Sequence, residues 1–272
     1  MDVSPPAPIR RPATAAAANA AAALPGFLFF AAAAAVVELA ARLGWLSSYF
    51  TPPTAIVAAM ARGLADGDIS GQIGMTLLAF SEGLLLAAVL AITIGVLMGA
   101  IPAVYDALRI VMEFLRPVPS VAMIPLAILF LGLGTSMRVA VITYAAFWPL
   151  LVSTIYGVRA VDPVALDTAR NFGVPPFEAL WRVTLPAALV NVATGLRVSA
   201  SIALVVTVTT ELVAGNNGVG FYIAQMEQAS RLPSMYAGIV LTGVLGYLVN
   251  VLFSALERKV VFWSPSARGT AQ

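Results

Sequence analysis

The sequence contains no cysteine and no histidine. Their absence excludes disulfides, thiolate and imidazole metal sites, cysteine nucleophiles and histidine general bases. Lysine is almost absent too, because Lys259 is the only one and it follows Arg258 rather than a glycine. The chain therefore has no G-x-x-x-x-G-K-[ST] phosphate-binding loop. If the protein uses ATP, a partner must supply the ATPase.

Charge is scarce as well. The 15 basic and 13 acidic residues make up 10% of the 272 residues, against about 25% in an average soluble domain. Hydrophobic residues account for 60% of the chain, and the mean hydropathy is +0.93. A soluble fold of this size cannot bury so much apolar surface. The sequence therefore indicates an integral membrane protein, and its scattered arginines favour a role in membrane topology over nucleic-acid binding.

Long intervals without charge locate the membrane spans, each of which needs about 20 apolar residues. The expected fold is an all-α membrane protein with six transmembrane helices, at residues 26–46, 73–101, 107–132, 137–156, 190–213 and 236–257. The third helix contains three prolines, which should bend or break it. They are Pro117, Pro119 and Pro125.

The distribution of cations predicts the orientation, because basic residues concentrate on the cytoplasmic side. With the N-terminus in the cytoplasm, 11 of the 15 cations lie inside, Arg116 and Arg197 among them. The four outside are Arg42, Arg62, Arg138 and Arg231. Both termini are then cytoplasmic. The expected domains are a low-complexity tail, a membrane domain and a second tail, at residues 1–25, 26–257 and 258–272. A cleaved signal peptide at the start of the chain is the less favoured alternative.

The external loop at residues 47–72 contains a short amphipathic pattern. Thr51-Pro-Pro-Thr54 opens the pattern, and Ile56, Met60 and Leu64 recur at helical spacing. We expect a short helix that lies on the outer membrane surface or caps the helix bundle.

The cytoplasmic loop at residues 157–189 carries the strongest signal in the sequence. Asp162 is placed to cap the N-terminus of a helix with Pro163 as its first residue. Gly173 is placed to end that helix. The pattern predicts a helix at 163–172, followed by a second helix that leads to the fifth span. A helix of about ten residues is marginal alone in water. It must therefore pack on this chain's own membrane helices or dock on a cytoplasmic partner.

The same loop resembles a known signature. Asp167-Thr168-Ala169 is followed by three residues, then Gly173, nine residues, Val183, one residue and Leu185-Pro186. The EAA signature of binding-protein-dependent ABC importer permeases has Glu-Ala-Ala, Gly, Ile and Leu-Pro at these spacings. The first two positions depart from it by Glu→Asp and Ala→Thr, which keep the charge and the small size.

Other segments are similar to the nitrate, sulfonate and taurine branch of these permeases. They are Arg116-Pro-Val-Pro119, the segment 130–134, Glu211 with the glycine-rich segment 215–220, and Glu257-Arg-Lys. The resemblance extends over residues 45–265. It implies the type I ABC importer permease (MetI-like) fold, in the inner (cytoplasmic) membrane of a bacterium.

The resemblance also implies partners. The chain would form a homodimer in the lipid bilayer, with a periplasmic solute-binding protein and two cytoplasmic ABC ATPase subunits that bind ATP and magnesium. It would be a transporter subunit without a cofactor of its own, and not an enzyme. The solute would be a sulfonate, taurine, nitrate or a similar small anion. The residues expected to couple to the ATPase are Asp167, Thr168, Ala169, Arg170, Phe172, Gly173, Leu185 and Pro186.

A second set of candidates lies in the fifth span. Thr207 and Thr210 belong to a face of small and polar residues. This face lines a translocation path, or it serves close helix packing with the hydroxyls bonded to their own helix. Glu211 near the outer end costs about 2–3 kcal/mol at membrane depth unless it is paired or wet. We expect it to act at a gate or to accept hydrogen bonds from backbone N–H groups of the loop at 215–220.

Three further polar residues are candidates for the translocation path. Asn216 and Asn217 are expected to line its outer mouth. Glu82 lies inside the second span, where it is either a functional carboxylate or a paired structural or interfacial one. Permeases of the branch often have an arginine and then small or apolar residues in this part of the span, so Phe80-Ser81-Glu82 departs from their pattern.

Two other classes of protein compete with the importer permease. A stand-alone secondary transporter or channel would explain broken helices and an intramembrane glutamate. It would not explain a capped cytoplasmic helix with the signature spacing. A membrane-embedded enzyme is disfavoured, because the chain has no histidine, no cysteine and no paired acidic motif.

Overall fold

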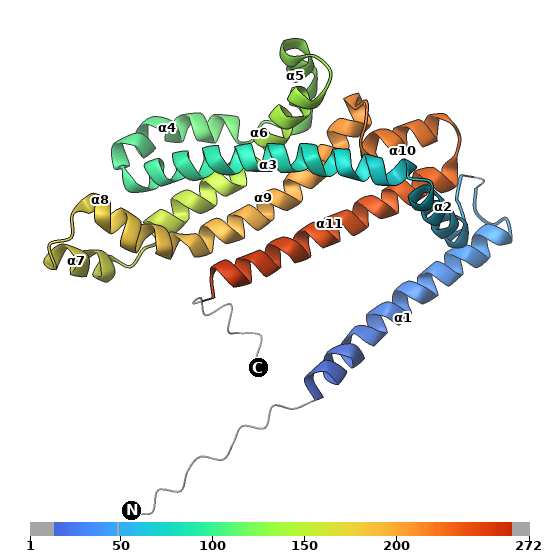
Figure 1. Cartoon of the computed structure of the whole chain (residues 1–272), viewed down its shortest axis with the longest axis horizontal. Coiled ribbons are helices and arrows are strands. Elements are labelled where there is room, and N and C mark those ends of the chain that lie inside the picture. Colours follow the sequence, from blue (N-terminus) through green and yellow to red (C-terminus); the bar gives the residue numbers. More distant parts are fainter. Residues whose placement is uncertain (1–13, 48, 263–272) are drawn as a thin grey trace, which may run out of the picture. The chain divides into compact units, whose positions relative to one another are not determined.

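The computed structural model describes residues 14–47 and 49–262, and of these it leaves the side chains of 14–24 and 27 undescribed (Figure 1). All regular elements in this described part are helical. They are α1 (Thr14–Arg42), α2 (Pro53–Ala65), α3 (Asp68–Ala100), α4 (Pro102–Leu115), η1 (Ser120–Met123), α5 (Ile124–Leu131), α6 (Thr135–Arg159), α7 (Pro163–Asn171), α8 (Pro176–Ala179), η2 (Leu180–Thr184), α9 (Leu185–Ala214), α10 (Val219–Gln228) and α11 (Leu232–Val260). The chain divides into two units, residues 1–58 and 59–272.

In the first unit, the end of α1 is joined to the start of α2 through Glu38. Its carboxylate accepts hydrogen bonds from Arg42 Nε at 2.6 Å and from the backbone N–H of Thr54 at 3.0 Å. The hydroxyl of Thr54 donates to it as well, at 2.8 Å. The short helix that the sequence predicts in the loop at 47–72 is thus confirmed as α2.

Four helical segments are long and apolar enough to cross a membrane, and a fifth is bent. The four are Asp68–Ala100, Thr135–Arg159, Pro176–Gln228 and Leu232–Val260. The bent pair Pro102–Leu115 and Ser120–Leu131 counts as one further span. The remaining expected span, 26–46, falls on α1, where not all side chains are described. The count of six therefore stays a prediction, whereas the all-helical membrane fold is confirmed.

The bend in the third expected span lies where the sequence places its prolines. α4 ends at Leu115, and α4 and the η1–α5 segment meet at an angle of 87°. Pro117 and Pro119 have no N–H to donate and disfavour helical backbone in the residue before them. The span also begins earlier than expected. Ile101 is extended, and Pro102 starts the new helix there instead of at residue 107.

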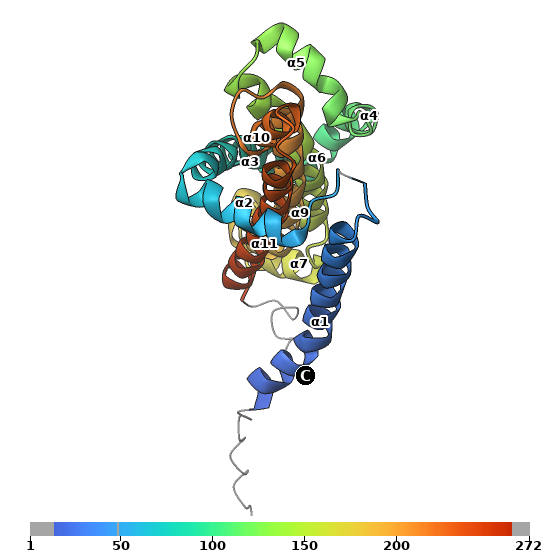
Figure 2. The same cartoon turned by 90° about the vertical axis from the view of Figure 1, so that its right-hand side faces the viewer.

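The core of the second unit is built around α6. This helix packs against α3 and against α9, while α11 and α10 pack on α9 (Figures 1 and 2). Glycines let α3 approach α6 closely. A Cβ built on Gly83 would overlap the side chain of Ile142, and one built on Gly95 would overlap Thr154. The backbones of α3 and α6 are therefore close together along this contact.

The path into the fifth span differs from the sequence prediction. The helix does not begin near residue 190, because α8, η2 and α9 follow one another without a break from Pro176 to Ala214. In η2, a π turn, the N–H of Leu185 bonds to the carbonyl of Leu180, five residues back. The extra residue in this turn lets the helix continue through Pro186, which has no N–H.

Candidate functional site

The loop between α6 and α9 presents α7 at one end of the second unit (Figure 1). The capping interactions that the sequence predicts are confirmed. Asp162 Oδ1 accepts a hydrogen bond from the backbone N–H of Val164 at 2.9 Å, and Pro163 is the first helical residue. The helix ends at Asn171, with Phe172 as its C-cap. α7 is therefore one residue shorter than expected.

Gly173 stops α7 with left-handed backbone, at φ 76°. Its N–H donates to the carbonyl of Arg170 at 2.9 Å, and the N–H of Val174 donates to the carbonyl of Ala169 at 3.0 Å. These two bonds form a Schellman motif, which satisfies carbonyls at the helix end. A Cβ on Gly173 would meet no atom within 4 Å. The backbone conformation alone thus favours glycine at this position.

The exposed side of α7 carries apolar side chains. Val164 is 70% exposed and Phe172 is 83% exposed, whereas Ala169 is buried. Asp167 and Arg170 form an exposed pair at 3.2 Å, of the kind that contributes at most about 1 kcal/mol. A capped helix with an exposed apolar residue near each end is suited to docking on another protein.

A hollow of about 780 Å³ lies between the loop and the adjoining ends of α3 and α6. Its lining includes Gly99, Arg159, Arg170 and Phe177. Arg159, the last residue of α6, is fixed there, because its guanidinium stacks on the ring of Tyr105 at 3.6 Å. The end of α6 is thus anchored, while α7 packs mainly against α8 and η2.

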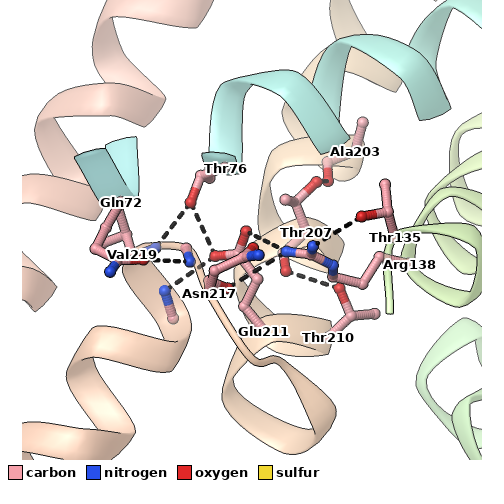
Figure 3. Close-up of polar contacts among 12 residues, drawn as sticks. Gln72, Thr76, Thr135, Arg138, Ala203, Thr207, Thr210, Glu211, Asn217 and Val219 are labelled. Atoms are coloured by element: carbon pink, nitrogen blue, oxygen red, sulfur yellow. Dashed lines mark hydrogen bonds and ion pairs between the residues drawn. The ribbon is translucent and has the colours of Figure 1, made fainter. Parts of the chain in front are cut away.

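A buried polar cluster lies at the opposite end of the second unit, around Glu211 of α9 (Figure 3). Glu211 is only 1% exposed. Its Oε2 accepts a hydrogen bond from Thr76 Oγ1 of α3 at 2.9 Å and another from the N–H of Gly220 in α10 at 3.0 Å. Arg138 of α6 lies with its Nη1 at 3.5 Å from Glu211 Oε1. One carboxylate therefore connects four helices.

The same cluster holds the loop between α9 and α10. Arg138 donates to the carbonyl of Asn217 at 3.3 Å. Gln72 Oε1 accepts from the N–H of Gly218 at 2.6 Å, and Thr76 Oγ1 accepts from the N–H of Val219 at 2.8 Å. The prediction that Glu211 accepts a bond from the backbone of the 215–220 segment is confirmed. We call Gln72, Thr76, Arg138, Glu211 and the bonded segment 217–220 the polar clamp.

Two glycines of the loop are required by the clamp. Gly218 has φ 98°, and a Cβ on it would overlap the carboxylate of Glu211. A Cβ on Gly220 would overlap the carbonyl oxygen of Val208. Any larger residue at either position would displace the carboxylate or the backbone of α9.

The structure gives the other membrane candidates different surroundings. Thr207 and Thr210 are buried within the chain, and their hydroxyls bond to the carbonyls of Ala203 at 2.7 Å and of Thr207 at 2.8 Å. In the single chain both hydroxyls thus bond to their own helix, which is the second of the two alternatives that the sequence allows. Asn216 is exposed and Asn217 is half-buried. Their role in a translocation path stays a prediction.

Glu82 is not part of the polar clamp. It is exposed on α3, and no residue of the described chain forms a hydrogen bond or ion pair with it. The structure thus brings Glu211 together with Asn217, and leaves Glu82 apart from both.

The sequence missed three members of the clamp: Gln72, Thr76 and Arg138. Arg138 was assigned to the outer surface as a topology signal, but its side chain is buried beside Glu211. The sequence did contain a signal for this pair. A carboxylate at membrane depth, such as Glu211, needs a cation, and Arg138 is expected at the same end of the bundle as Glu211. α10 was missed as well, because no capping side chain precedes it. Within residues 14–47 and 49–262, no group of three or more acidic side chains is placed to hold a metal ion.

A comparison with protein families matches residues 83–262 to the binding-protein-dependent transport system inner membrane component. The chain belongs to this permease family. The matched residues contain α7 and its caps as well as Arg138, Glu211 and α10.

Known relatives of this permease cover most of its length. A putative aliphatic sulfonates transport permease protein, SsuC of Bacillus subtilis, is 32% identical over 233 residues, which cover 85% of this chain and 84% of the relative. The taurine transport system permease protein TauC of Escherichia coli is 29% identical, with 82% and 83% covered. The nitrate import permease protein NrtB of Synechocystis is 28% identical, with 73% and 72% covered. The similarity to the sulfonate, taurine and nitrate branch is confirmed.

Solved structures support the fold of this permease. Inward-facing conformations of the MetNI methionine ABC transporter contain a chain that matches with a TM-score of 0.61 at 18% identity, covering 71% of this chain and 96% of that chain. The expected MetI-like permease fold is thereby confirmed. The protein is a transport subunit of the inner membrane, and a stand-alone transporter is not favoured.

Proposed function

We propose that this permease forms the translocation path of an ATP-binding-cassette importer for a small anionic solute. The names of its relatives support a sulfonate, taurine, nitrate or a similar compound. A periplasmic solute-binding protein would deliver the solute, as the description of the family implies. Two copies of the chain and two ATPase subunits would complete the importer.

The observation that carries this proposal is the geometry of α7. The helix is capped at both ends, so it keeps its shape when force is applied to it. Val164 near its start and Phe172 at its end are exposed and would be buried in a groove of an ATPase subunit. Asp167 and Arg170 would exchange their mutual pair for contacts with that subunit.

Movement of the ATPase would reach the membrane through the two chain connections of α7. One leads to the end of α6, where Arg159 is anchored, and the other leads through η2 into α9. Because α6 and α9 both contribute to the polar clamp, displacement at one end can alter the other end. Glu211 and Arg138 would then hold the outer gate, with Asn216 and Asn217 at its mouth.

This arrangement requires α7 in the cytoplasm and α10 on the outer side. Both termini of the chain would be cytoplasmic, as the distribution of cations predicts. ATP and magnesium would be bound by the ATPase subunits alone.

The test is ATP hydrolysis by the reconstituted complex, with the ATPase and binding protein encoded beside this chain. Gly173→Asp forces a side chain into left-handed backbone and is expected to abolish stimulation by the binding protein while the membrane subunits still assemble. Gly71→Asp is the matched control, because Gly71 also has open space around it but has no left-handed backbone. Stimulation that survives Gly173→Asp, or a wild-type complex that never forms, would overturn the proposal.

A further inference from the structure

An apolar groove of about 690 Å³ runs between α3 and the segment that leads from α8 into α9. Thr93, Val96 and Leu97 of α3 line one side, and residues of the segment 177–192 line the other. The lining contains no charged residue. Leu97 and Leu189 are exposed, so the groove opens to the surface of two membrane-spanning segments.

The groove continues into the hollow of about 780 Å³ beside the loop that carries α7. Phe177 and Leu180 line both of them. Along α3, the groove ends at Leu97 and the hollow begins at Gly99, just before the helix ends at Ala100. One continuous depression therefore runs from the apolar surface of the membrane helices to the loop outside the membrane.

Trp181 indicates the depth at which the depression changes from apolar to polar. It lines the groove and is 60% exposed, and tryptophan is enriched at the boundary between hydrocarbon and water. Arg159 lines the hollow, beyond the apolar lining. The groove therefore lies at the depth of lipid acyl chains, and the hollow lies at the depth of lipid headgroups.

Arg159 is a cation that no carboxylate of the described residues balances. Its guanidinium stacks on the ring of Tyr105 at 3.6 Å, and its Nη2 donates to the carbonyl of Met98 at 3.4 Å. The other arginine that lines the hollow, Arg170, pairs with Asp167 at 3.2 Å. The hollow thus holds one guanidinium that is fixed in position and keeps its full positive charge.

The two parts of the depression together fit one class of ligand. A fixed guanidinium binds a phosphate group through charge-assisted hydrogen bonds. Basic pockets between membrane helices on the cytoplasmic side bind anionic lipid headgroups. An acyl chain of the same lipid fits an apolar groove that opens to hydrocarbon. A free phosphate ion would use only the hollow and would leave the groove unexplained.

The helix α1 is a poorer occupant of this depression. It would cover the apolar lining, but its only acidic residue is Glu38. The carboxylate of Glu38 already accepts hydrogen bonds from Arg42 and Thr54. α1 therefore offers no free carboxylate to Arg159, whereas an anionic phospholipid supplies both the apolar chain and the negative charge.

We propose that the groove and the hollow form one binding site for an anionic phospholipid of the cytoplasmic leaflet, with its phosphate on Arg159 and one acyl chain between α3 and the segment 177–192. The bound lipid would join the ends of α3 and α6 to α8 and η2, through which the loop that carries α7 continues into α9. This inference rests on the proposed function only for the side of the membrane on which α7 lies.

Photoactivatable lipids test the site directly. The full chain is placed in phosphatidylcholine nanodiscs, alone and together with the ATPase encoded beside it. The nanodiscs contain a trace of a probe lipid with a diazirine in one acyl chain and either a phosphoglycerol or a phosphocholine headgroup. Labelled peptides are identified by mass spectrometry. The phosphoglycerol probe is expected to label residues 92–97 and 177–192 in excess over the phosphocholine probe.

Substitution of Arg159 tests the headgroup contact. One arginine near an anionic lipid corresponds to about fivefold in affinity, so Arg159→Gln is expected to lower the excess labelling about fivefold. Arg159→Lys keeps the charge and should retain most of the excess, which separates loss of charge from loss of fold. Arg258→Gln is the matched control, because Arg258 is an exposed cation of α11 that does not line the hollow, and it should leave the excess unchanged.

Filling of the groove tests the acyl-chain contact. The indole of Thr93→Trp would occupy the groove without a change of charge, and labelling of residues 177–192 by the phosphoglycerol probe should be lost. Leu85→Trp is the control, because Leu85 is 68% exposed on the same helix but lies outside the groove. Its labelling pattern should match that of the wild type.

The outcomes separate this site from the importer. Equal labelling by the two probes, or an excess that survives Arg159→Gln, overturns the site. No labelling of residues 92–97 and 177–192 by either probe also overturns it, because α1 or another protein surface then covers the groove. A complex with binding-protein-stimulated ATP hydrolysis but without the excess overturns the site and leaves the importer standing. The expected labelling in a chain that binds no ATPase supports the site and counts against the importer.

Discussion

Arg138 of α6 and Glu211 of α9 form an ion pair in which Nη1 and Oε1 are 3.5 Å apart and both side chains are almost fully buried. The two residues are 73 positions apart in the sequence, and the loop that carries α7 lies between them. Glu211 also holds the N–H of Gly220, and Arg138 holds the carbonyl of Asn217. The pair therefore fixes where the chain turns back after α9, at the end of the bundle opposite α7.

Removing one member of this pair should be costly. Arg138→Met leaves the carboxylate of Glu211 buried without its cation, and such a loss costs about 3–5 kcal/mol in buried pairs. Thermal unfolding of the purified permease in detergent should show a clearly lower midpoint. Glu211→Gln should have a similar effect, because Arg138 then lacks its anion.

The double variant Arg138→Met with Glu211→Met is the control for this prediction. It removes both charges together, so its loss should be smaller than the sum of the two single losses. Strictly additive losses would show that the two side chains do not stabilise each other. The ion pair would then have no role in holding the clamp.

Gly218→Ala should loosen α10. The new Cβ would overlap the carboxylate of Glu211, and the backbone at φ 98° disfavours a side chain, which alone costs about 1–2 kcal/mol. Limited proteolysis should cut the loop between α9 and α10 faster than in the wild type. Gly243→Ala is the control, because a Cβ at Gly243 meets nothing within 4 Å. Equal cleavage of the two variants would contradict the crowding at Gly218.

The sequence predicts local features of the site better than long-range ones. The caps of α7 could be predicted, because Asp162, Pro163 and Gly173 act on backbone groups within a few residues of themselves. The bend after α4 could be predicted for the same reason, since proline acts on its own turn.

The polar clamp could not be predicted in full, because its members come from four helices. Only packing brings Thr76 and Arg138 to Glu211, and a sequence pattern does not specify which helices become neighbours. The bounds of the fifth span were wrong for a related reason. Proline usually interrupts a helix, but the π turn at Leu180–Thr184 removes the conflict ahead of Pro186.

Phe172→Ala should weaken binding of the ATPase subunit without affecting the fold. The ring is 83% exposed in the chain, so its loss leaves no cavity there. Burial of a phenylalanine in an interface contributes about 1.5–3 kcal/mol, which corresponds to about 10–100-fold in Kd. The affinity can be measured by titration of nanodisc-embedded permease with the ATPase.

Phe30→Ala is the matched control for Phe172→Ala. Phe30 is a similarly exposed phenylalanine, but it belongs to α1 and not to the loop at residues 157–189. Its removal should leave the affinity for the ATPase unchanged. Equal affinities of wild type and Phe172→Ala would mean that the C-terminal end of α7 is not the docking contact.

Gly83→Ala should separate α3 from α6, because its Cβ would overlap Ile142. Gly74→Ala in the same helix has open space and is expected to be neutral or stabilising by up to about 1 kcal/mol. The midpoint of thermal unfolding should therefore fall in the Gly83 variant and stay the same or rise in the Gly74 variant. Equal midpoints of the two variants would contradict the close packing of α3 on α6 at Gly83.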